Sequence, residues 1–543
     1  MRIGVLELLS QGRSRNWSER AYGYLLLKQY ASIMPQAISV WCREFGHEVF
    51  YATYYDQKDP KQLLPNDLDV VFISAHTQAS ALAYALAKLY RQEKTLTVIG
   101  GPHAKQFPDD CLRFFDVVVR DCDKTLIADI LSALPRREIV TSGRTLQDIP
   151  SVQERMPEIR ISNFWRGRPY FLALIPLLTS MGCPYSCDFC VDWDNPYVLL
   201  PLERLEADLC FILENFPEAL VGFHDPNFAV KFDQVLAILE RVSPHDGRNR
   251  YAMETALSIL RQSRLERLRD VGCFFIGTGV ESWTAYSNKS GTGSAVSGRE
   301  KLDRVVEHFK LIHSYIPALQ THLIFGLDVD EGDEPVELTK EFMTRAPFVW
   351  PTICVPTPFG GTPLYDQHLA EGRILTSMPF AFYWGPYLVT RFKNYSPLTY
   401  YEKCIELFSH MTSASTLAKR VRTTSGKVCL AYLARTFGMR QMVGTFRRFA
   451  ELLKTDRQFR AFHERESDIL PEYYHRRYEI LLGPYASLMS REERLPVHNP
   501  IQPAPQPAMD REDYEAARSN TPSPRLARRR DVPTASEDER SET

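Results

Sequence analysis

Short apolar runs alternate with helical patterns along the first part of the chain. The runs are continuous rather than broken by alternating polar residues, which is typical of parallel strands that helices cover on both faces. Between the third and fourth runs, Leu82, Leu86 and Leu89 fall on one face of a helix. The pattern predicts an α/β, doubly wound domain over residues 1–135. Its predicted strands are residues 2–9, 48–53, 69–74, 95–99 and 116–119.

A second alternating series follows residues 136–165, a charged stretch with Pro150 and Pro157 that we interpret as a linker. Its apolar runs recur about every 36 residues, which is the length of a unit of strand, helix and strand. Six such units predict a βα barrel, full or partial, over residues 166–395. The runs begin near Phe171, Ala219, Tyr251, Cys273, Gln320 and Thr352.

The last part of the chain divides into a helical region, residues 396–490, and a tail, residues 491–543. Apolar residues from Phe446 to Phe462 keep the spacing of an amphipathic helix face. Residues 401–490 hold 15 Lys and Arg against 9 Asp and Glu, which fits either solvated helix faces or a site for an anionic substrate or partner. The tail is rich in proline and charge and is predicted to be disordered.

Composition narrows the function classes. The chain has 543 residues, a formal charge of −2 and 11 cysteines. Because the charge is balanced, the protein lacks the overall positive field that attracts nucleic acid, and we expect no nucleic-acid partner. The cysteines are too sparse for a disulfide scaffold, so we expect a reduced, cytoplasmic protein. The first residues do not form a secretory signal, and the longest apolar run, Phe171 to Leu178, is too short for a membrane span.

Three of the cysteines, Cys183, Cys187 and Cys190, stand in a C-x3-C-x2-C motif. Three thiolates on one loop favour zinc, copper(I) or an iron-sulfur cluster. A closed zinc site needs a fourth ligand, which Cys210 or His224 could supply only through a tertiary contact. A 4Fe-4S cluster normally takes four cysteines, so three would leave one iron open. The loop follows the first barrel strand, where barrel enzymes place their reactive groups.

This motif, with Phe189 as its aromatic residue, resembles the signature of the radical SAM superfamily. The resemblance extends over residues 165–390, although Gly360 and Met181 stand where proline and arginine are common. It implies that Cys183, Cys187 and Cys190 hold a 4Fe-4S cluster whose open iron binds S-adenosylmethionine (SAM). The other segments that carry it are Gly222–Phe228, Ile276–Ser282, Ile324–Asp328 and Gly361–Tyr365. The SAM-site candidates are Phe189, Asp225, Glu254, Gly279 and Glu281.

Simpler roles remain open for three of these candidates. Glu281 follows two glycines and is as well suited to pairing with a neighbouring arginine as to holding SAM. Glu254, which closes the third strand, has the same two alternatives. Asp225 follows a strand end and precedes Pro226, so it fits the capping of a turn at least as well as binding a ligand.

The first domain adds a second resemblance. Ile99-Gly-Gly-Pro-His-Ala104 is similar to the Rossmann-like cobalamin-binding domain of the B12-binding radical SAM subfamily. The cobalamin-site candidates are Ser74, Thr77, Gly100, Gly101 and Pro102, all at strand ends. The D-x-H-x-x-G motif is absent and Arg120–Asp123 replaces a G-E-G-E segment. These departures fit either cobalamin without a protein imidazole or a domain that has lost its cofactor, and His103 is interpreted as a turn residue.

Together the resemblances imply a cobalamin-dependent radical SAM methyltransferase that acts on an unactivated carbon of a small molecule, through a 5′-deoxyadenosyl radical and methylcobalamin. Such an enzyme needs an external electron donor such as a ferredoxin or flavodoxin. One alternative is a radical SAM oxidoreductase or cyclase without methyl transfer. Another, from a different class, is a non-catalytic iron-sulfur or corrinoid sensor.

Overall fold

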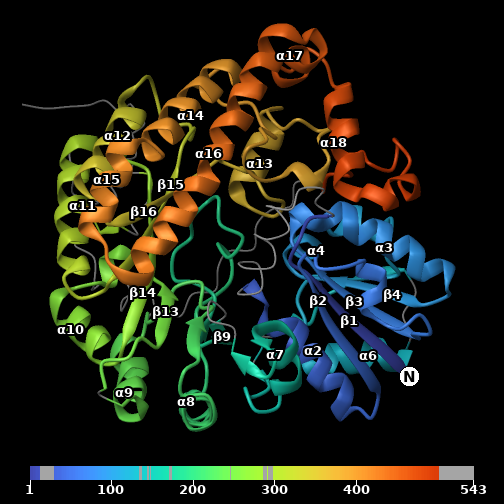
Figure 1. Ribbon diagram of the computed structural model, residues 1–543. Coiled ribbons are helices and arrows are strands. Elements are labelled where there is room, and N and C mark those ends of the chain that lie inside the picture. Colours follow the sequence, from blue (N-terminus) through green and yellow to red (C-terminus); the bar gives the residue numbers. More distant parts are fainter. Residues whose placement is uncertain are drawn as a thin grey trace, which may run out of the picture.

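Two parallel sheets stand side by side, and helices from the last part of the chain arch over both (Figure 1). The protein is described here from a computed structural model. The structure describes residues 1–12, 30–133, 137–143, 146, 148–169, 174–244, 246–284, 286, 290–291 and 297–499.

The first sheet has six parallel strands in the order β2-β1-β3-β4-β5-β6. Buried apolar side chains lie on both faces, with helix α2 (Ile33–Glu44) against one and α3 (Ser80–Gln92) against the other, as the continuous apolar runs require. The doubly wound prediction is confirmed, and five strands lie within two residues of their predicted positions. The strands are β1 (Arg2–Leu8), β2 (Glu48–Tyr54), β3 (Val70–Ala75), β4 (Leu96–Gly100), β5 (Val117–Val119) and β6 (Glu138–Val140).

Residues 136–165 differ from the predicted linker, because they contain strand β6 and helix α7 (Met156–Asn163). Helix α7 packs against α2 and β2. Just before it, the buried Arg155 donates to Gln36 Oε1 at 2.7 Å and to the Pro176 carbonyl at 3.2 Å. Arg155 of this stretch therefore links the first domain to the second through hydrogen bonds.

The second sheet is a partial barrel of six parallel strands in the order β16-β15-β14-β13-β12-β9. Each strand neighbours the next in sequence, and a helix follows each of the first five, which confirms the prediction from the 36-residue spacing. The strands are β9 (Leu174–Leu177), β12 (Leu220–Phe223), β13 (Tyr251–Glu254), β14 (Cys273–Glu281), β15 (Ala318–Ile324) and β16 (Val349–Cys354). The helices are α8 (Leu202–Asn215), α9 (Phe232–Val242), α10 (Gln262–Asp270), α11 (Gly298–His313) and α12 (Glu334–Arg345).

The helical region begins at Ser396, whose side chain accepts from the Thr399 amide and so caps the next helix. Phe446, Phe449 and Phe459 are buried, as the predicted apolar face requires. The helices are α14 (Pro397–Met411), α15 (Ala414–Thr423), α16 (Gly426–Thr455), α17 (Arg457–His463) and α18 (Glu472–Leu482).

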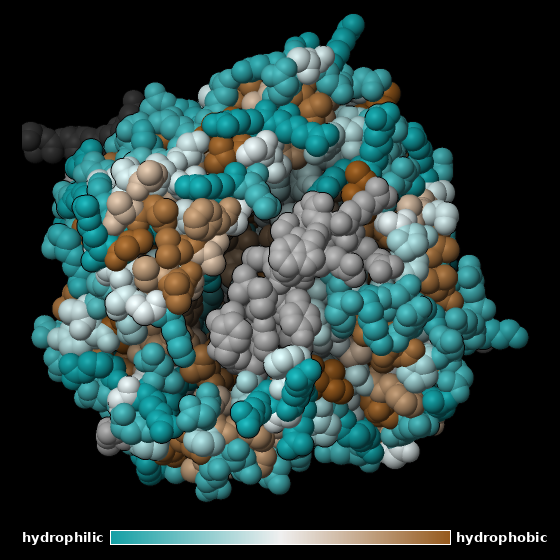
Figure 2. All heavy atoms as spheres, in the orientation of Figure 1, coloured by the Kyte–Doolittle hydropathy of each residue, from teal (hydrophilic) through white to brown (hydrophobic). Residues whose placement is uncertain are grey.

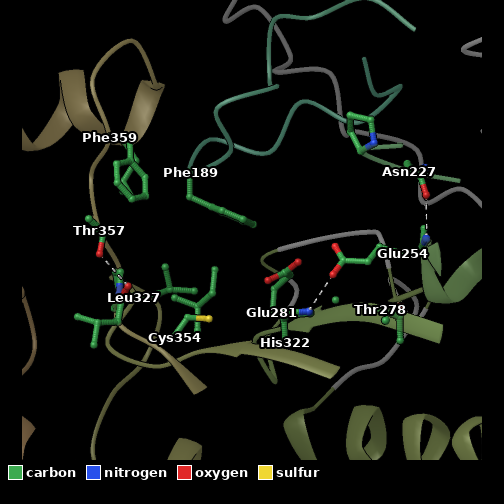
Figure 3. Close-up of a pocket in the computed structure, with 18 of the residues that line it drawn as sticks. Phe189, Asn227, Glu254, Thr278, Glu281, His322, Leu327, Cys354, Thr357 and Phe359 are labelled. Carbon is green, nitrogen blue, oxygen red and sulfur yellow. Dashed lines mark hydrogen bonds and ion pairs between the residues drawn. The ribbon is translucent and has the colours of Figure 1, made fainter. Parts of the chain in front are cut away.

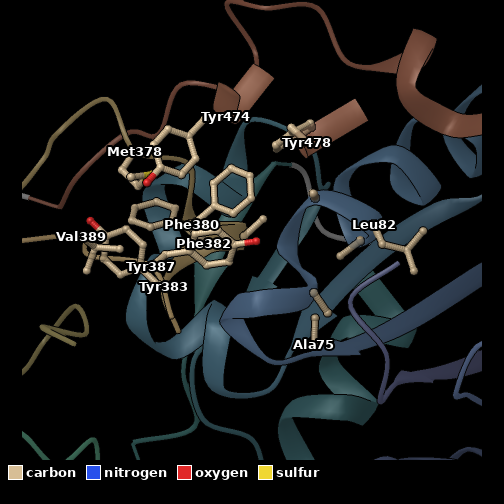
Figure 4. Packing of buried hydrophobic residues seen from close by; sticks show 14 of the residues in the cluster. Ala75, Leu82, Met378, Phe380, Phe382, Tyr383, Tyr387, Val389, Tyr474 and Tyr478 are labelled. Carbon is tan, nitrogen blue, oxygen red and sulfur yellow. The ribbon is translucent and has the colours of Figure 1, made fainter. Parts of the chain in front are cut away.

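A single apolar core joins these helices to the first domain. Tyr474 of α18 and Leu82 of α3 belong to it, together with the aromatic segment around Phe380 (Figure 4). Phe380 stacks on Phe107 of the first domain at a centroid distance of 3.7 Å. The helical region therefore holds the two sheet domains in a fixed relation.

Residues 491–499, which composition assigns to the tail, make specific contacts. The Val497 amide donates to Asp110 Oδ1 at 2.8 Å, and Asn499 Nδ2 donates to the Gln106 carbonyl at 2.7 Å. The remainder of the predicted tail, residues 500–543, lies outside the described residues. In the described parts of the chain, none of the helices has the length and apolar character needed to cross a bilayer.

Candidate functional site

A cavity of about 300 Å³ opens at the carboxyl ends of the second sheet's strands. We call residues 182–197 the cysteine loop. Figure 3 shows Phe189 of this loop entering the cavity opposite Glu281 and Cys354, which belong to strands of the sheet. Barrel enzymes place their reactive groups at this end of the sheet. Four of the five SAM-site candidates line the cavity, namely Phe189, Glu254, Gly279 and Glu281.

Two glycines of β14 make room for the two carboxylates. A Cβ atom on Gly279 would stand 2.1 Å from Glu281 Oε1, and one on Gly277 would stand 3.0 Å from Glu254 Cγ. Glu281 lies at an irregularity of the β14–β15 pairing, has φ +65° and is 6% exposed. Gly279 of the G-x-G-x-E pattern is thus a packing requirement for the buried Glu281 carboxylate, whereas Gly277 lies beneath the exposed side chain of Glu254.

The charges of Glu254 and Glu281 affect the pKa values of two neighbouring groups, Cys354 and Lys301. Burial raises the pKa of the Cys354 thiol to about 12, and the charges of Glu281 and Glu254 act in the same direction, so the thiol stays protonated at neutral pH. Burial lowers the pKa of Lys301 to about 8, while Glu281 opposes that shift. Lys301 also donates to the Thr284 carbonyl at 2.8 Å. It therefore supplies a positive charge beneath Glu281.

A line of polar groups runs along β15 to the cavity. His322 Nε2 lies 3.9 Å from Glu254 Oε1, and Gln320 Nε2 lies 3.3 Å from the same ring nitrogen (Figure 3). Gln320 Oε1 in turn accepts from Arg435 of α16 at 2.8 Å. Gln320 and His322 share one face because side chains of a strand alternate. His322 is not among the residues that the sequence motifs predict for the site.

Two buried polar atoms in the cavity wall have no hydrogen-bond partner among the described residues: Asn227 Nδ2 and Thr278 Oγ1. The Asn227 carbonyl oxygen accepts from the Ala256 amide at 2.8 Å, which fixes the side chain and leaves its NH2 group as an available donor. Leaving such groups unpaired in a protein interior costs about 1–3 kcal/mol each. A polar ligand in the cavity could satisfy Asn227, whereas Thr278, between Gly277 and Gly279, points its side chain to the opposite face of β14. Neither residue is among the predicted candidates; both lie in segments that carry the resemblance.

Asp225, the fifth SAM-site candidate, is not among the described residues that line the cavity. Its carboxylate accepts from the Thr179 amide and hydroxyl, the latter at 2.5 Å, and from the Ser180 hydroxyl at 2.6 Å. Burial raises the pKa of Asp225, and these hydrogen bonds oppose the rise. The geometry favours a structural role, since Asp225 ties the end of β12 to the residues just before the cysteine loop.

The cysteine loop is closed tightly at its base. Strands β10 (Ser180–Met181) and β11 (Val198–Leu199) pair in antiparallel fashion, and the Cys183 amide donates to the Asn195 carbonyl at 3.2 Å. Gly182 has φ +68°, and a Cβ atom there would stand 2.1 Å from the Pro196 carbonyl oxygen. One short loop therefore carries the thiols of Cys183, Cys187 and Cys190.

These thiols suit iron, because soft thiolates are the ligands of iron-sulfur clusters. Over the described ranges, no three His, Cys, Asp or Glu side chains are grouped as a single metal ion would require. A 4Fe-4S cluster does not require such a group, since each of its cysteines binds a different iron atom. Beside the thiols, the Phe189 ring stacks on Tyr286 at a centroid distance of 6.0 Å, and Tyr286 donates to Asp188.

The cobalamin-site candidates meet at one edge of the first sheet. Ser74 and Gly100 are register partners on β3 and β4, and space is open where Gly100 would carry a side chain. Gly101 has φ +89°, and a Cβ atom there would stand 3.0 Å from Ser74 Oγ. Pro102 begins α4 (Pro102–Gln106). Thr77 differs, because its buried hydroxyl donates to Gln106 Oε1 at 2.6 Å.

His103 is fully buried. Its Nε2 lies 2.6 Å from the Tyr84 hydroxyl, which donates to Asp110 at 2.6 Å. Burial lowers the pKa of His103 to about 3, so the ring is neutral. His103 therefore has a packing role, and it lies within helix α4 and not in the turn that the sequence predicts.

Helix α4 also contacts the cysteine loop and the barrel. Lys105 Nζ donates to Asn195 Oδ1 at 3.0 Å, and Trp193 of the cysteine loop donates to the Gly361 carbonyl at 2.8 Å. A Cβ atom on Gly360 would stand 2.1 Å from the Gln106 carbonyl oxygen. The cysteine loop therefore lies between the cavity and the edge of the first sheet.

One family model and several known proteins match this chain. The model of the radical SAM superfamily matches residues 177–342. The chain is 23% identical to bacteriochlorophyllide d C-8(2)-methyltransferase of Chlorobaculum tepidum over 360 residues, 63% of this chain and 77% of the relative. It is 24% identical to the hopanoid C-2 methylase of Rhodopseudomonas palustris over 322 residues, 56% of this chain and 58% of the relative.

Among solved structures, the chain is similar to the radical S-adenosylmethionine methyltransferase TsrM from Kitasatospora setae, described with cobalamin and a [4Fe-4S] cluster bound. The sequence identity is 14% and the TM-score 0.48, covering 70% of this chain and 76% of that one. The superfamily match includes the three-cysteine motif and most of the strands that form the cavity. Residues 177–342 therefore match the radical SAM superfamily, and the protein is a radical SAM enzyme.

Proposed function

We propose that the protein is a cobalamin-dependent radical SAM methyltransferase that acts on an unactivated carbon of a small molecule. The observation that carries the proposal is the position of the cysteine loop. Phe189 of this loop lines the cavity, while Asn195 accepts a hydrogen bond from Lys105 of the first domain. One loop thus contacts both places where cofactors would be bound.

In this proposal Cys183, Cys187 and Cys190 hold the 4Fe-4S cluster. When bound, the cluster and SAM supply one-electron cleavage of a carbon-sulfur bond, and the protein supplies position and a dry site. The carboxylates of Glu254 and Glu281 suit groups that carry N–H or O–H, such as the amino group and ribose of SAM. The available NH2 donor of Asn227 suits its carboxylate or ring nitrogens.

The first domain would hold cobalamin at the edge formed by Ser74, Gly100 and Gly101. A flat ligand can approach the backbone closely at Gly100, where a side chain would otherwise occupy open space, while Gly101 allows the backbone turn with φ +89°. Ligands of doubly wound sheets bind outside the carboxyl ends of the strands. Curated relatives named as methyltransferases support methyl transfer as the reaction. An external electron donor such as a ferredoxin or flavodoxin completes the proposal.

Anaerobic purification and reconstitution test the proposal. Absorption spectra should show both iron-sulfur and cobalamin bands, and incubation with SAM and a strong reductant should yield 5′-deoxyadenosine. A variant with Cys183, Cys187 and Cys190 all replaced by Ala should lose the iron and the product. Cys210→Ala, which removes a partly exposed thiol outside the loop, should keep both.

The products separate the alternatives. S-adenosylhomocysteine together with a methylated product supports the methyltransferase. Production of 5′-deoxyadenosine without S-adenosylhomocysteine in the presence of cobalamin would indicate a radical enzyme without methyl transfer. Neither product, with the cluster verified intact, would indicate a sensor.

A further inference from the structure

Helix α16 is apolar on two opposite faces. Its buried side contains Tyr432, Val443 and Phe446, which pack on the barrel and on α14. Its outer side carries Leu430, 67% exposed, and Phe437, 55% exposed. An outer helix face normally carries polar residues, and a helix that is apolar all round contacts something other than water.

The exposed apolar residues form a continuous stripe. Leu430, Ala434 and Phe437 recur at the three- to four-residue spacing that places side chains on one helix face. Val421 of the neighbouring helix α15 is 46% exposed and extends the surface. We define the apolar patch as Val421, Leu430, Ala434 and Phe437. Figure 2 shows hydrophobic side chains gathered over the amino-terminal half of α16.

The segment of chain that carries the apolar patch has charge of one sign. No Asp or Glu occurs between Glu406 and Glu451, whereas that segment contains eight Lys and Arg residues. Across the described residues, none of these eight forms an ion pair with a carboxylate within 4 Å. The eight are Lys419, Arg420, Arg422, Lys427, Arg435, Arg440, Arg447 and Arg448.

Two of the eight are used inside the protein. Arg420 is buried over the Trp350 ring and donates to the Met411 carbonyl, and Arg435 bonds to Gln320. The others lie at or near the surface. Lys427 precedes Leu430 by one helical turn, and the guanidinium of Arg440 lies 5.0 Å from the centre of the Phe437 ring. Lys427 and Arg440 therefore place positive charge beside the apolar patch.

We propose that the apolar patch docks on the surface of a lipid bilayer that contains anionic lipids. Leucine and phenylalanine flanked by Lys and Arg are the composition of helices that lie in the plane of a bilayer, with apolar side chains at the boundary of headgroups and acyl chains. Unpaired cations are attracted to anionic headgroups. A nucleic acid would satisfy the cations but would leave Leu430 and Ala434 in water. This inference is independent of the proposed reaction, because it concerns a different face of the chain.

Vesicle flotation tests the proposal with the full-length protein. The vesicles are phosphatidylcholine alone or phosphatidylcholine with one third phosphatidylglycerol, at low and high salt. We expect binding only to the anionic vesicles and a loss of binding at high salt. Leu430→Gln and Phe437→Gln should each weaken binding about tenfold. Arg422→Gln and Lys427→Gln should each weaken it roughly fivefold.

Matched controls lie at the other end of α16 and beyond. Ile469 is 78% exposed, more than either apolar residue of the patch, and Arg457 is exposed at the start of α17. Ile469→Gln and Arg457→Gln should bind vesicles as the unaltered protein does. Helices rise 1.5 Å per residue, so Arg457 lies roughly 40 Å along the chain's helices from Leu430.

Unchanged circular dichroism would show that the variants are folded. The proposal is overturned if the unaltered protein fails to bind anionic vesicles at low salt, or if the control variants lose as much binding as the patch variants. It is also overturned if a short RNA binds as tightly as the vesicles and Leu430→Gln leaves both affinities unchanged. That result would identify a polyanion surface in place of a bilayer surface.

Discussion

Gly279→Ala is expected to displace the carboxylate of Glu281 and to destabilise the barrel. The new Cβ atom would stand 2.1 Å from Glu281 Oε1 and 2.8 Å from its carboxyl carbon, far inside the 3.4 Å of ordinary contact. Glu281 has little freedom to retreat, since it is 6% exposed and already held at φ +65°. Overpacking of this kind costs about 1–3 kcal/mol.

Gly277→Ala is the matched control on the same strand. Its Cβ atom would stand 3.0 Å from Glu254 Cγ. The Glu254 side chain is 62% exposed and can swing aside. The expected change in the free energy of unfolding is therefore within about 0.5 kcal/mol, as for an ordinary surface substitution.

Two measurements on both variants check the reasoning: the free energy of unfolding by chemical denaturation, and SAM affinity by anaerobic calorimetry on the reconstituted enzyme. Gly279→Ala should lower the first by about 1–3 kcal/mol and weaken SAM binding about tenfold, which corresponds to 1.4 kcal/mol. Gly277→Ala should leave the free energy of unfolding nearly unchanged. Equal stability and equal SAM affinity for the two variants would refute the argument that Glu281 depends on the bare Cα of residue 279.

Three further substitutions have defined outcomes. Thr278→Val removes an unpaired buried hydroxyl at constant shape, on the face of β14 that points away from the cavity, so the protein should unfold at the same or a higher temperature and keep its SAM affinity; a loss of stability would contradict the unpaired state. Asp225→Ala should lower the iron content after reconstitution, because it releases Thr179 and Ser180 at the base of the cysteine loop, and Asp225→Asn should retain more iron; equal iron in both would contradict this role. Burial raises the pKa of Glu7 from 4.5 to about 7, so between these pH values the folded chain holds a proton that the unfolded chain has released, and stability falls as pH rises. Glu7→Gln should remove this slope and gain roughly 3 kcal/mol over the unaltered protein between pH 4.5 and 7; parallel pH curves would count against it.

The strands could be predicted because their signal is local. A buried parallel strand needs a continuous apolar run, and a crossover unit has a fixed length, so both sheets follow from spacing alone. The cysteine motif is equally local. The role of residues 136–165 has no local signal. Arg155 is buried by partners on α2 and β9, which the sequence does not place beside it.

The cavity residues illustrate the same limit. Glu254 and Glu281 could be predicted as site residues because each ends its strand. Whether their carboxylates point into a cavity depends on Gly277 and Gly279, over which the two side chains lie. His322 lies in mid-strand and reaches the cavity only through the inward face of β15. Residues 491–499 have the composition of a tail, and their order comes from hydrogen bonds to Asp110 and Gln106.

The departures from the superfamily pattern have a common cause in the contact between the two sheet domains. Gly360 replaces a proline because the Gln106 carbonyl lies where any Cβ atom would be. Met181, in place of a common arginine, packs against the apolar cluster of the first domain, as does Cys122 of the altered Arg120–Asp123 segment. Asp121 of that segment lies 3.5 Å from Lys105, which also bonds to the cysteine loop. Features that weaken a motif match in sequence are therefore the contacts that bring the first sheet's strand edge and the cysteine loop together.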